Sequence, residues 1–152
     1  RGGRVAERYR PPSMPTSYVL GRDGVVRYVH SGWEPGDAER IEAEVAASDQ
    51  NRQVGLMNRK AMPQQRGMLF VFTQNNTHCM WMRNTLLPLS VAFLDEDGKI
   101  INIEDMQPQT EDNHCARRPA RYALEMNLGW FAQRGIKPGV KLGGLDKAPR
   151  PQ

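Results

Sequence analysis

The sequence predicts an α+β domain made mostly of antiparallel β-strands, with a curled or barrel-like sheet, a few short helices and an N-terminal β-hairpin appendage. Three observations lead to this fold class. Apolar residues come in short runs bounded by polar or glycine-containing turns, as buried strands are. Asp-Gly steps separate two pairs of such runs, which is typical of hairpins. Regular alternation of strand and helix patterns is lacking, which argues against a doubly wound parallel sheet.

The length of 152 residues and the net charge of +4 fit one ordinary domain and exclude some classes of protein. No apolar run reaches the roughly 18 residues that a transmembrane segment needs. The first four residues do not resemble a signal peptide, so we expect none in this sequence. The densest basic group, Arg117, Arg118 and Arg121, is too short for a nucleic-acid-binding stripe. We therefore expect a solvated loop there and no nucleic acid partner.

The first third of the chain contains a predicted hairpin and one ambiguous segment. The β-rich runs 16–20 and 25–30 flank an Asp-Gly turn. In the segment 38–47, Ile41 and Val45 are one helical turn apart, but apolar and polar residues also alternate as in a half-buried strand. We predict a strand over residues 41–46, because only the domain that follows is complete enough to bury its apolar side.

From residue 48 onward, the predicted elements follow one another at short intervals. Ser48 or Asp49 can cap a short helix, and we expect Val54, Met57 and Met62 on its inner face. Apolar runs predict six further strands, at residues 67–72, 79–83, 90–94, 99–103, 122–126 and 140–142. A helical turn at residues 130–134 and a flexible, proline-rich tail at residues 146–152 complete the prediction.

Residues 41–145 carry the resemblance to one known family. The segments concerned are Gly-Leu-Met-Asn-Arg at 55–59, the apolar run 67–72, Met-Trp-Met-Arg-Asn-Thr at 80–85 with Pro88, the Asp97-Gly98 turn, Tyr-Ala-Leu-Glu-Met at 122–126 with Gly129, and residues 136–139. In order and spacing they resemble the domain of unknown function 192 family, which implies one complete domain. Ser90 stands where that family commonly has an acidic residue, so we assign no role to such a carboxylate.

Residues 1–40 resemble a different family. Residues 13–18, with Pro15 as a candidate cis-proline, are similar to the C-terminal half of a thioredoxin-like domain of the membrane-anchored, extracytoplasmic reductase type, as are the Asp23-Gly24 turn and Gly32-Trp33. The catalytic half is missing and the sequence has no Cys-x-x-Cys, so the redox chemistry of that family is not carried over. We expect a fragment fused to the second domain, or an artificial junction.

The two cysteines each follow a histidine, as His78-Cys79 and His114-Cys115. Together these side chains suggest a tetrahedral zinc site, but neighbours on a strand point to opposite faces, and the spacing differs from that of common zinc sites. We favour a disulfide between Cys79 and Cys115, with two free buried thiols as the remaining alternative. A disulfide suits the periplasmic or secreted location that the thioredoxin-like resemblance implies.

Other residue groups suggest chemistry less specifically. Six methionines surround His78 and Cys79 in the sequence: Met57, Met62, Met68, Met80, Met82 and Met106. Thioethers suit Cu(I), but methionine also fills irregular gaps in cores. Ser90 with either histidine lacks a nucleophile motif, and no phosphate-binding loop is present. Glu104 and Asp105 can be a carboxylate dyad or solvated residues after a strand.

A ligand site is predicted where polar residues follow the ends of elements. Arg59 follows the short helix, and Asn84 and Thr85 follow the strand at 79–83. Arginine can hold a carboxylate or phosphate, and the amide and hydroxyl can donate and accept, so the three predict the polar end of an apolar pocket. Its apolar lining would come from Met57, Met68 or Trp81. The alternative is that Arg59 ties down loop carbonyls and that Asn84 and Thr85 form a turn.

These observations predict a small extracytoplasmic binding or accessory domain, with no enzyme chemistry and no cofactor demonstrable from the sequence. Its partner would be an unknown small molecule or protein. A periplasmic soft-metal (copper) binder and a thiol-disulfide oxidoreductase are the alternatives. The latter is disfavoured because cysteines so far apart lack the geometry of an easily exchanged disulfide.

Overall fold

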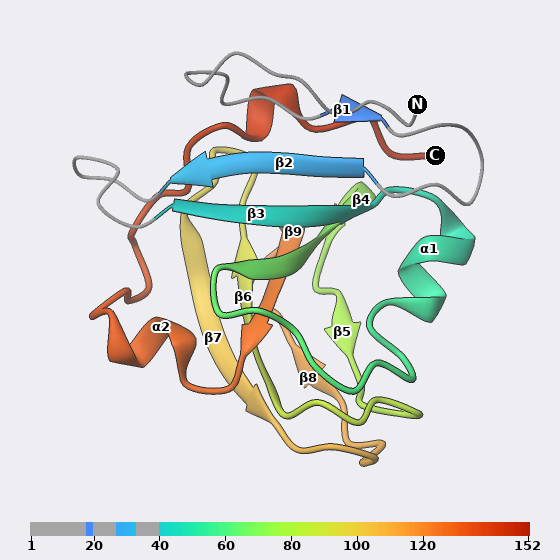
Figure 1. The fold of residues 1–152 in the computed structure, drawn as a ribbon. Helices are drawn as coiled ribbons and strands as arrows, with labels where there is room; N and C mark the ends of the chain where they lie inside the picture. Colours follow the sequence, from blue (N-terminus) through green and yellow to red (C-terminus); the bar gives the residue numbers. More distant parts are fainter. Residues whose placement is uncertain (1–17, 20–26, 33–39) are drawn as a thin grey trace.

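Seven strands form one mixed sheet, and two very short strands form a second one (Figure 1). The structure is a computed structural model that describes residues 18–19, 27–32 and 40–152. The strands of the large sheet are β1 (Tyr18–Val19), β2 (Arg27–Gly32), β3 (Arg40–Ala46), β4 (Arg66–Asn76), β6 (Leu89–Leu94), β7 (Ile100–Met106) and β9 (Ala120–Asn127). The remaining elements are α1 (Asp49–Val54), β5 (Cys79–Met80), β8 (His114–Cys115), α2 (Trp130–Gln133) and the 3-10 turn η1 (Leu145–Lys147).

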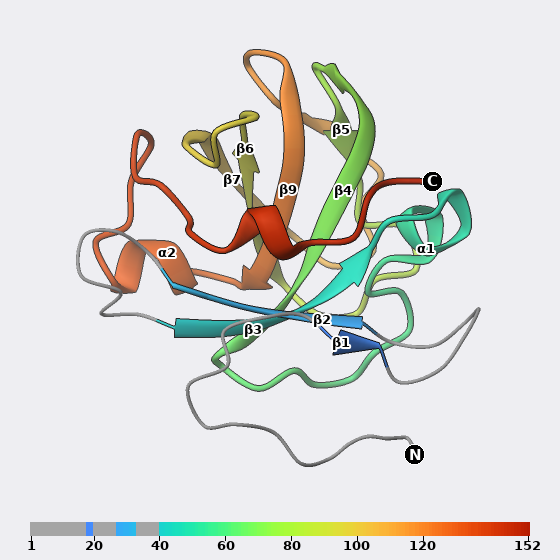
Figure 2. The same cartoon turned by 90° about the horizontal axis from the view of Figure 1, so that it is seen from above.

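The large sheet has the strand order β1-β2-β3-β4-β9-β6-β7. Every pair of neighbours is antiparallel except β3 and β4, which run parallel from Glu42 opposite Arg66 to Ala46 opposite Phe70. A parallel pair needs a long crossover, and residues 47–65, which include α1, provide it. Figure 2 shows β2 and β3 crossing the direction of β4 and β9, so the sheet is strongly curled. It is not closed into a barrel. The predicted α+β, mostly antiparallel class is confirmed.

The middle strands of the sheet are buried on both faces. On β4, Leu69 and Val71 belong to one apolar cluster, which also contains Trp130 of α2. The alternate residues Phe70 and Phe72 belong to a second cluster on the other face. Double burial explains why residues 67–72 read as a continuous apolar run rather than an alternating one, and it confirms the predicted central strand.

The segment with two interpretations, residues 41–46, is a strand as predicted. Ile41, Ala43 and Val45 of β3 enter the first cluster. On its other side β3 pairs with β2, and β2 pairs with β1, so the strands of the expected N-terminal hairpin continue the large sheet. The turn at Asp23-Gly24 and the candidate cis-proline Pro15 lie outside the described residues.

Helix α1 begins as predicted, but its buried face differs from the prediction. The Ser48 hydroxyl accepts a hydrogen bond from the backbone N–H of Asn51 at 3.1 Å. Val54 is half exposed and none of the α1 residues is buried, so the expected inner face of the helix is wrong. The reason is Gly55, whose φ of 49° ends the helix and turns Leu56 into the core instead. Met57 and Met62 lie beyond the end of the helix; both are partly buried, and Met62 packs against the second cluster.

Two predicted strands are shorter than expected, whereas β4, β7 and β9 are longer. The strand predicted at 79–83 ends at Met80, because a turn follows in which Thr85 N–H donates to Met82 O and Asn84 has a φ of 54°. The strand predicted at 140–142 is reduced to an isolated bridge between Lys99 and Lys141. The β6–β7 hairpin is confirmed, but β7 extends to Met106. Its Glu104 and Asp105 therefore lie within the strand rather than after it.

The segment predicted to be a flexible tail makes contacts with the body of the domain. The backbone N–H of Gln152 donates to Ala47 O at 2.6 Å, and its carbonyl oxygen accepts from Arg52 at 2.5 Å. Leu145, at the start of η1, is buried in the first cluster. Within the described residues, no helix has the length and apolar character needed to cross a bilayer.

The predicted disulfide is present between Cys79 of β5 and Cys115 of β8, which lie directly opposite each other. Reduction should lower the free energy of unfolding by about 4 kcal/mol, the chain-entropy value for a loop of this length. Urea unfolding with and without reductant measures this loss of stability. The double variant Cys79→Ala/Cys115→Ala is the control, because its free energy of unfolding should be the same with and without reductant. Two free thiols per chain under denaturing, non-reducing conditions would contradict the pairing.

Close packing at Gly67 gives a second test of the fold. An ideal Cβ placed there would lie 2.3 Å from the carbonyl oxygen of Glu125 and 2.3 Å from Met126 Sδ on the neighbouring β9. Gly67→Ala should therefore cost at least about 3 kcal/mol of stability, because a paired backbone oxygen cannot move away. At Gly135 an added Cβ would meet no atom within 4 Å, and the only strain would come from the positive φ of 68°. Gly135→Ala should therefore cost about 1 kcal/mol in the same urea titration. Equal losses of stability in the two variants would show that β4 and β9 are not packed as closely at Gly67 as the structure indicates.

Candidate functional site

A cavity of about 510 Å³ lies between the turn that follows α1 and the loop that follows β5. Figure 1 shows these two elements at the same side of the sheet. The cavity is hereafter the Glu125 pocket, and its lining residues are Arg52, Gln53, Val54, Gly55, Leu56, Met57, Phe70, Cys79, Met80, Trp81, Arg83, Asn84, Thr85 and Glu125. Leu56, Phe70, Thr85 and Glu125 are buried, so they form its inner part, whereas Trp81, Arg83 and Asn84 are exposed at its rim.

The structure brings together four of the residues predicted to form a ligand site. Met57, Trp81, Asn84 and Thr85 all line the Glu125 pocket. Arg59 does not: its guanidinium forms two parallel hydrogen bonds with the carboxylate of Glu44 on β3, one of them 2.7 Å long. The arginine fork therefore binds a carboxylate of the chain itself.

Met68, the remaining predicted lining residue, is buried on β4 directly opposite Glu125 of β9. The hydroxyl of Thr85 also has an internal partner, since it donates to Arg83 O at 3.1 Å. Asn84 and Thr85 thus form the turn of the alternative interpretation, and they line the pocket as well.

Two turns with left-handed backbone geometry shape the wall of the pocket. Asn58 and Asn84 have φ values of 65° and 54°, a region that asparagine enters more readily than most residues. The backbone N–H of Asn58 donates to Asn84 O at 2.9 Å, which joins the two turns. Cys79, held by the disulfide, fixes the start of the loop from the other side.

Glu125 is the residue that the sequence analysis missed. It lies in the middle of β9, between Met68 of β4 and Val91 of β6, and only 4% of its surface is exposed. In the described part of the chain, its carboxyl group makes no hydrogen bond or ion pair. Burial raises the pKa of Glu125 from 4.5 to about 8. A sequence signal existed, because Glu125 interrupts the apolar run of a strand buried on both faces.

Two arginines bring positive charge to the pocket, and both have other partners. Arg52 donates to the carbonyl oxygens of Ala47 and Val71 at 2.7 and 2.8 Å and pairs with Asp49 at 2.7 Å. The guanidinium of Arg83 lies over the Trp81 ring, 5.5 Å from its centroid. Neither arginine forms an ion pair with Glu125.

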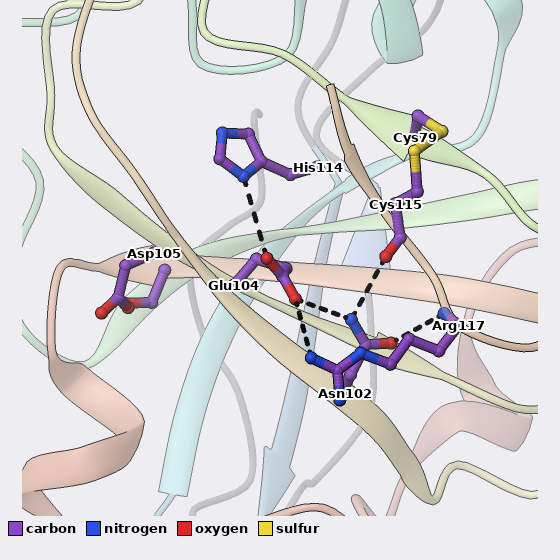
Figure 3. Close-up of polar contacts among 8 residues, drawn as sticks. Cys79, Asn102, Glu104, Asp105, His114, Cys115 and Arg117 are labelled. Carbon is purple, nitrogen blue, oxygen red and sulfur yellow. Dashed lines mark hydrogen bonds and ion pairs between the residues drawn. A yellow bond between two sulfur atoms is a disulfide. The ribbon is translucent and has the colours of Figure 1, made fainter. Parts of the chain in front are cut away.

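A second polar cluster connects β7 with β8, as Figure 3 shows. The buried Asn102 side chain donates to Glu104 at 3.1 Å and to Cys115 O at 3.2 Å, and its oxygen accepts from Arg117 N–H at 3.1 Å. Glu104 also lies 3.9 Å from His114 Nδ1 and 3.9 Å from the Arg117 guanidinium. Asn102 satisfies its hydrogen-bonding groups within the chain, so this cluster fastens the two strands together.

The combination of Ser90 with a histidine is not formed. The Ser90 hydroxyl donates to Asp105 at 2.6 Å and accepts from Gly129 N–H at 2.9 Å. His78 stacks on Phe72 with ring centroids 3.8 Å apart, and His114 faces Glu104. The Asp105 carboxylate thus lies next to Ser90, the position at which the related family commonly has an acidic residue.

The alternative zinc site loses its thiolates in this structure, because both sulfur atoms are in the disulfide. Figure 3 shows the His114 ring turned toward Glu104 and away from the two sulfur atoms. Over the ranges that the structure describes, no three His, Cys, Asp or Glu side chains are grouped closely enough to hold a metal ion.

Comparison with solved structures gives relatives that share the fold over most of this chain. A crystal structure from Novosphingobium aromaticivorans, described as a protein of unknown function, is 28% identical, covers 90% of this chain and 99% of its own, and has a TM-score of 0.75. A crystal structure from Sinorhizobium meliloti, provisionally described as a transcription regulator, is 34% identical, covers 77% of this chain and 95% of its own, and has a TM-score of 0.72. No curated protein matches the chain.

The profile of one protein family matches most of the chain. It covers residues 31–144, which include β3 to β9, both sides of the Glu125 pocket and the disulfide. The match begins within β2, ten residues before the boundary that the sequence resemblance suggested. The chain belongs to the uncharacterised ACR family, the domain of unknown function 192.

Proposed function

We propose that this protein is a small-molecule-binding domain and that the Glu125 pocket is its binding site. The observation that carries the proposal is the buried carboxyl group of Glu125, which lines a cavity and has no partner within the described residues. Buried carboxyl groups are nearly always paired, because an unpaired one costs several kcal/mol in its charged form. A buried, unpaired carboxyl group that faces a cavity is therefore a candidate for ligand binding or catalysis.

The composition of the pocket supports the proposal. Leu56, Phe70 and the two methionines Met57 and Met80 give apolar walls, and polar groups converge at the rim and at Glu125. Small-molecule sites combine an apolar lining with a few placed polar groups, in cavities of about 300–1,000 Å³. At about 510 Å³ this cavity falls within that range.

We further propose that the domain works outside the cytoplasm, in the periplasm or as a secreted protein. The disulfide supports this location, since disulfides persist in oxidising compartments.

Copper binding is the second candidate, and one observation favours it: Met57 and Met80 line the same pocket as Glu125. Against it, three of the methionines singled out in the sequence, Met68, Met82 and Met106, are buried in the second apolar cluster and serve as core packing. We therefore rank it below the binding of an organic molecule.

The raised pKa of Glu125 links its environment to the stability of the domain. Below pH 4.5 the carboxyl group is protonated in both the folded and the unfolded chain. Between pH 4.5 and about 8 the unfolded chain releases a proton that the folded chain keeps, so the free energy of unfolding falls as the pH rises. Above about pH 8 the carboxyl group is ionised in both states, and its contribution no longer changes.

Glu125→Gln should remove this pH dependence. The variant should become more stable than the unaltered protein by up to about 1.4 kcal/mol for each pH unit between pH 5 and 8. Urea unfolding at pH 5, 6, 7 and 8 measures the difference. Glu111→Gln changes an exposed carboxylate outside the pocket and should stay within about 0.5 kcal/mol of the unaltered protein. Parallel stability curves for Glu125→Gln and the unaltered protein would show that Glu125 is not enclosed.

Binding itself can be tested with the dye 8-anilinonaphthalene-1-sulfonate at pH 6, where Glu125 is protonated. We expect one molecule of dye per chain with enhanced fluorescence. Met57→Trp should lower the affinity at least tenfold, because it fills the pocket with a larger side chain. Leu128→Trp, at an exposed position outside the lining, should leave it unchanged. If the two variants bind the dye alike, the pocket is not the binding site.

A further inference from the structure

We propose that the Glu125 pocket selects a ligand with a protonated amine on an apolar body, and that the Glu125 carboxylate is the counter-ion of the amine. This inference rests on the proposed function, because it names the chemical class that the same pocket takes.

The first argument is the unmet hydrogen-bonding capacity of Glu125. The side chain starts from the middle of β9, and its neighbours on the two adjacent strands are Met68 and Val91, neither of which can donate a hydrogen bond. In its ionised form the Glu125 side chain only accepts hydrogen bonds, so a ligand that pairs with the carboxylate has to bring donors. An ammonium group brings three donors and the opposite charge, and charge-assisted hydrogen bonds are the strongest kind available.

The second argument concerns the charges that face Glu125. In the described residues, the charged side chains that share its pocket are Arg52 from α1 and Arg83 from the loop after β5. Arg52 is held by three carbonyl oxygens and Asp49, and Arg83 lies over Trp81. β4 and β6 place the apolar residues Met68 and Val91 against Glu125. The position of the counter-ion of Glu125 is therefore left to a ligand.

The third argument concerns the rest of the ligand. Between Glu125 and the rim, the walls are the side chains of Leu56, Phe70, Met57 and Met80, with the Trp81 ring at the opening. Such walls fit methylene groups or an aromatic ring rather than a sugar or a second charge. The open end lies beside Arg83 and Asn84, so a longer ligand can end in a polar group there.

Binding of an ammonium should release a proton. In the empty pocket at pH 7 the Glu125 carboxyl group is mostly protonated, since burial raises its pKa to about 8. The ammonium keeps its own proton and stabilises the carboxylate, so the carboxyl proton passes to the solvent. The affinity for an amine should therefore rise nearly tenfold per pH unit from pH 6 to pH 7, less steeply towards pH 8, and level off above that.

Isothermal titration calorimetry of the full chain with hexylamine, hexan-1-ol and hexanoate tests this inference. We expect hexylammonium to bind at least tenfold more tightly than hexan-1-ol at pH 8, and hexanoate to bind least. In two buffers of different ionisation enthalpy at pH 7, hexylammonium should release close to one proton per chain. Glu125→Gln should lose the preference for the amine and its pH dependence but still bind hexan-1-ol, whereas Glu111→Gln should behave like the unaltered protein.

The outcomes separate this inference from the proposed function. Equal affinity for hexylammonium and hexan-1-ol, or no proton release, would overturn the amine inference and leave the pocket as a binding site. If none of the three compounds binds and the dye experiment also fails, both proposals are wrong. Proton release is measured on the unaltered protein, so the test stands even if the Glu125→Gln variant does not fold.

Discussion

The central parts of β4, β9 and β6 are covered on both faces, and this double burial sets the environment of Glu125. One face lies against α2 and η1, and the other lies under β5, β8 and the loops beside them. Gly67 permits the close approach of β4 to β9 that this packing requires. A carboxyl group in the middle of β9 is held away from bulk water, so Glu125 faces a cavity and, once ionised, lowers the stability of the fold.

The cavity beside Glu125 depends on contacts made far from it in the sequence. Gly55 ends α1 and turns Leu56 inward, and the hydrogen bond between Asn58 and Asn84 closes one wall. The disulfide fixes β5 against β8, and the Asn102 side chain fixes β8 against β7. The pocket wall is therefore attached to the sheet by a covalent bond and a satisfied polar cluster, although β5 itself is only two residues long.

Short-range signals account for the elements that were predicted correctly. The Asp97-Gly98 turn forms as expected because Gly98 supplies a φ of 86° and the Asp95 carboxylate accepts two backbone hydrogen bonds. Ser48 caps α1 for the same local reason. The strand at 79–83 was overestimated because the apolar run continues to Met82, while the chain already turns to donate a hydrogen bond from Met82 N–H to Thr110 O. That contact joins residues 28 positions apart and leaves no local signal.

Local sequence signals also explain which residues of the candidate site were predicted and which were not. By itself, the sequence predicted Asn84 and Thr85 as the polar end of a pocket, because they follow a recognisable strand, with Met57 and Trp81 as candidates for its apolar lining, and it predicted that Cys79 and Cys115 pair. Only the tertiary structure decided that Arg59 is taken by Glu44 and that Glu125 is enclosed without a partner. The physical reason is that the partner and the burial of a charged side chain are set by neighbouring strands, which come from segments 15 to more than 50 residues away.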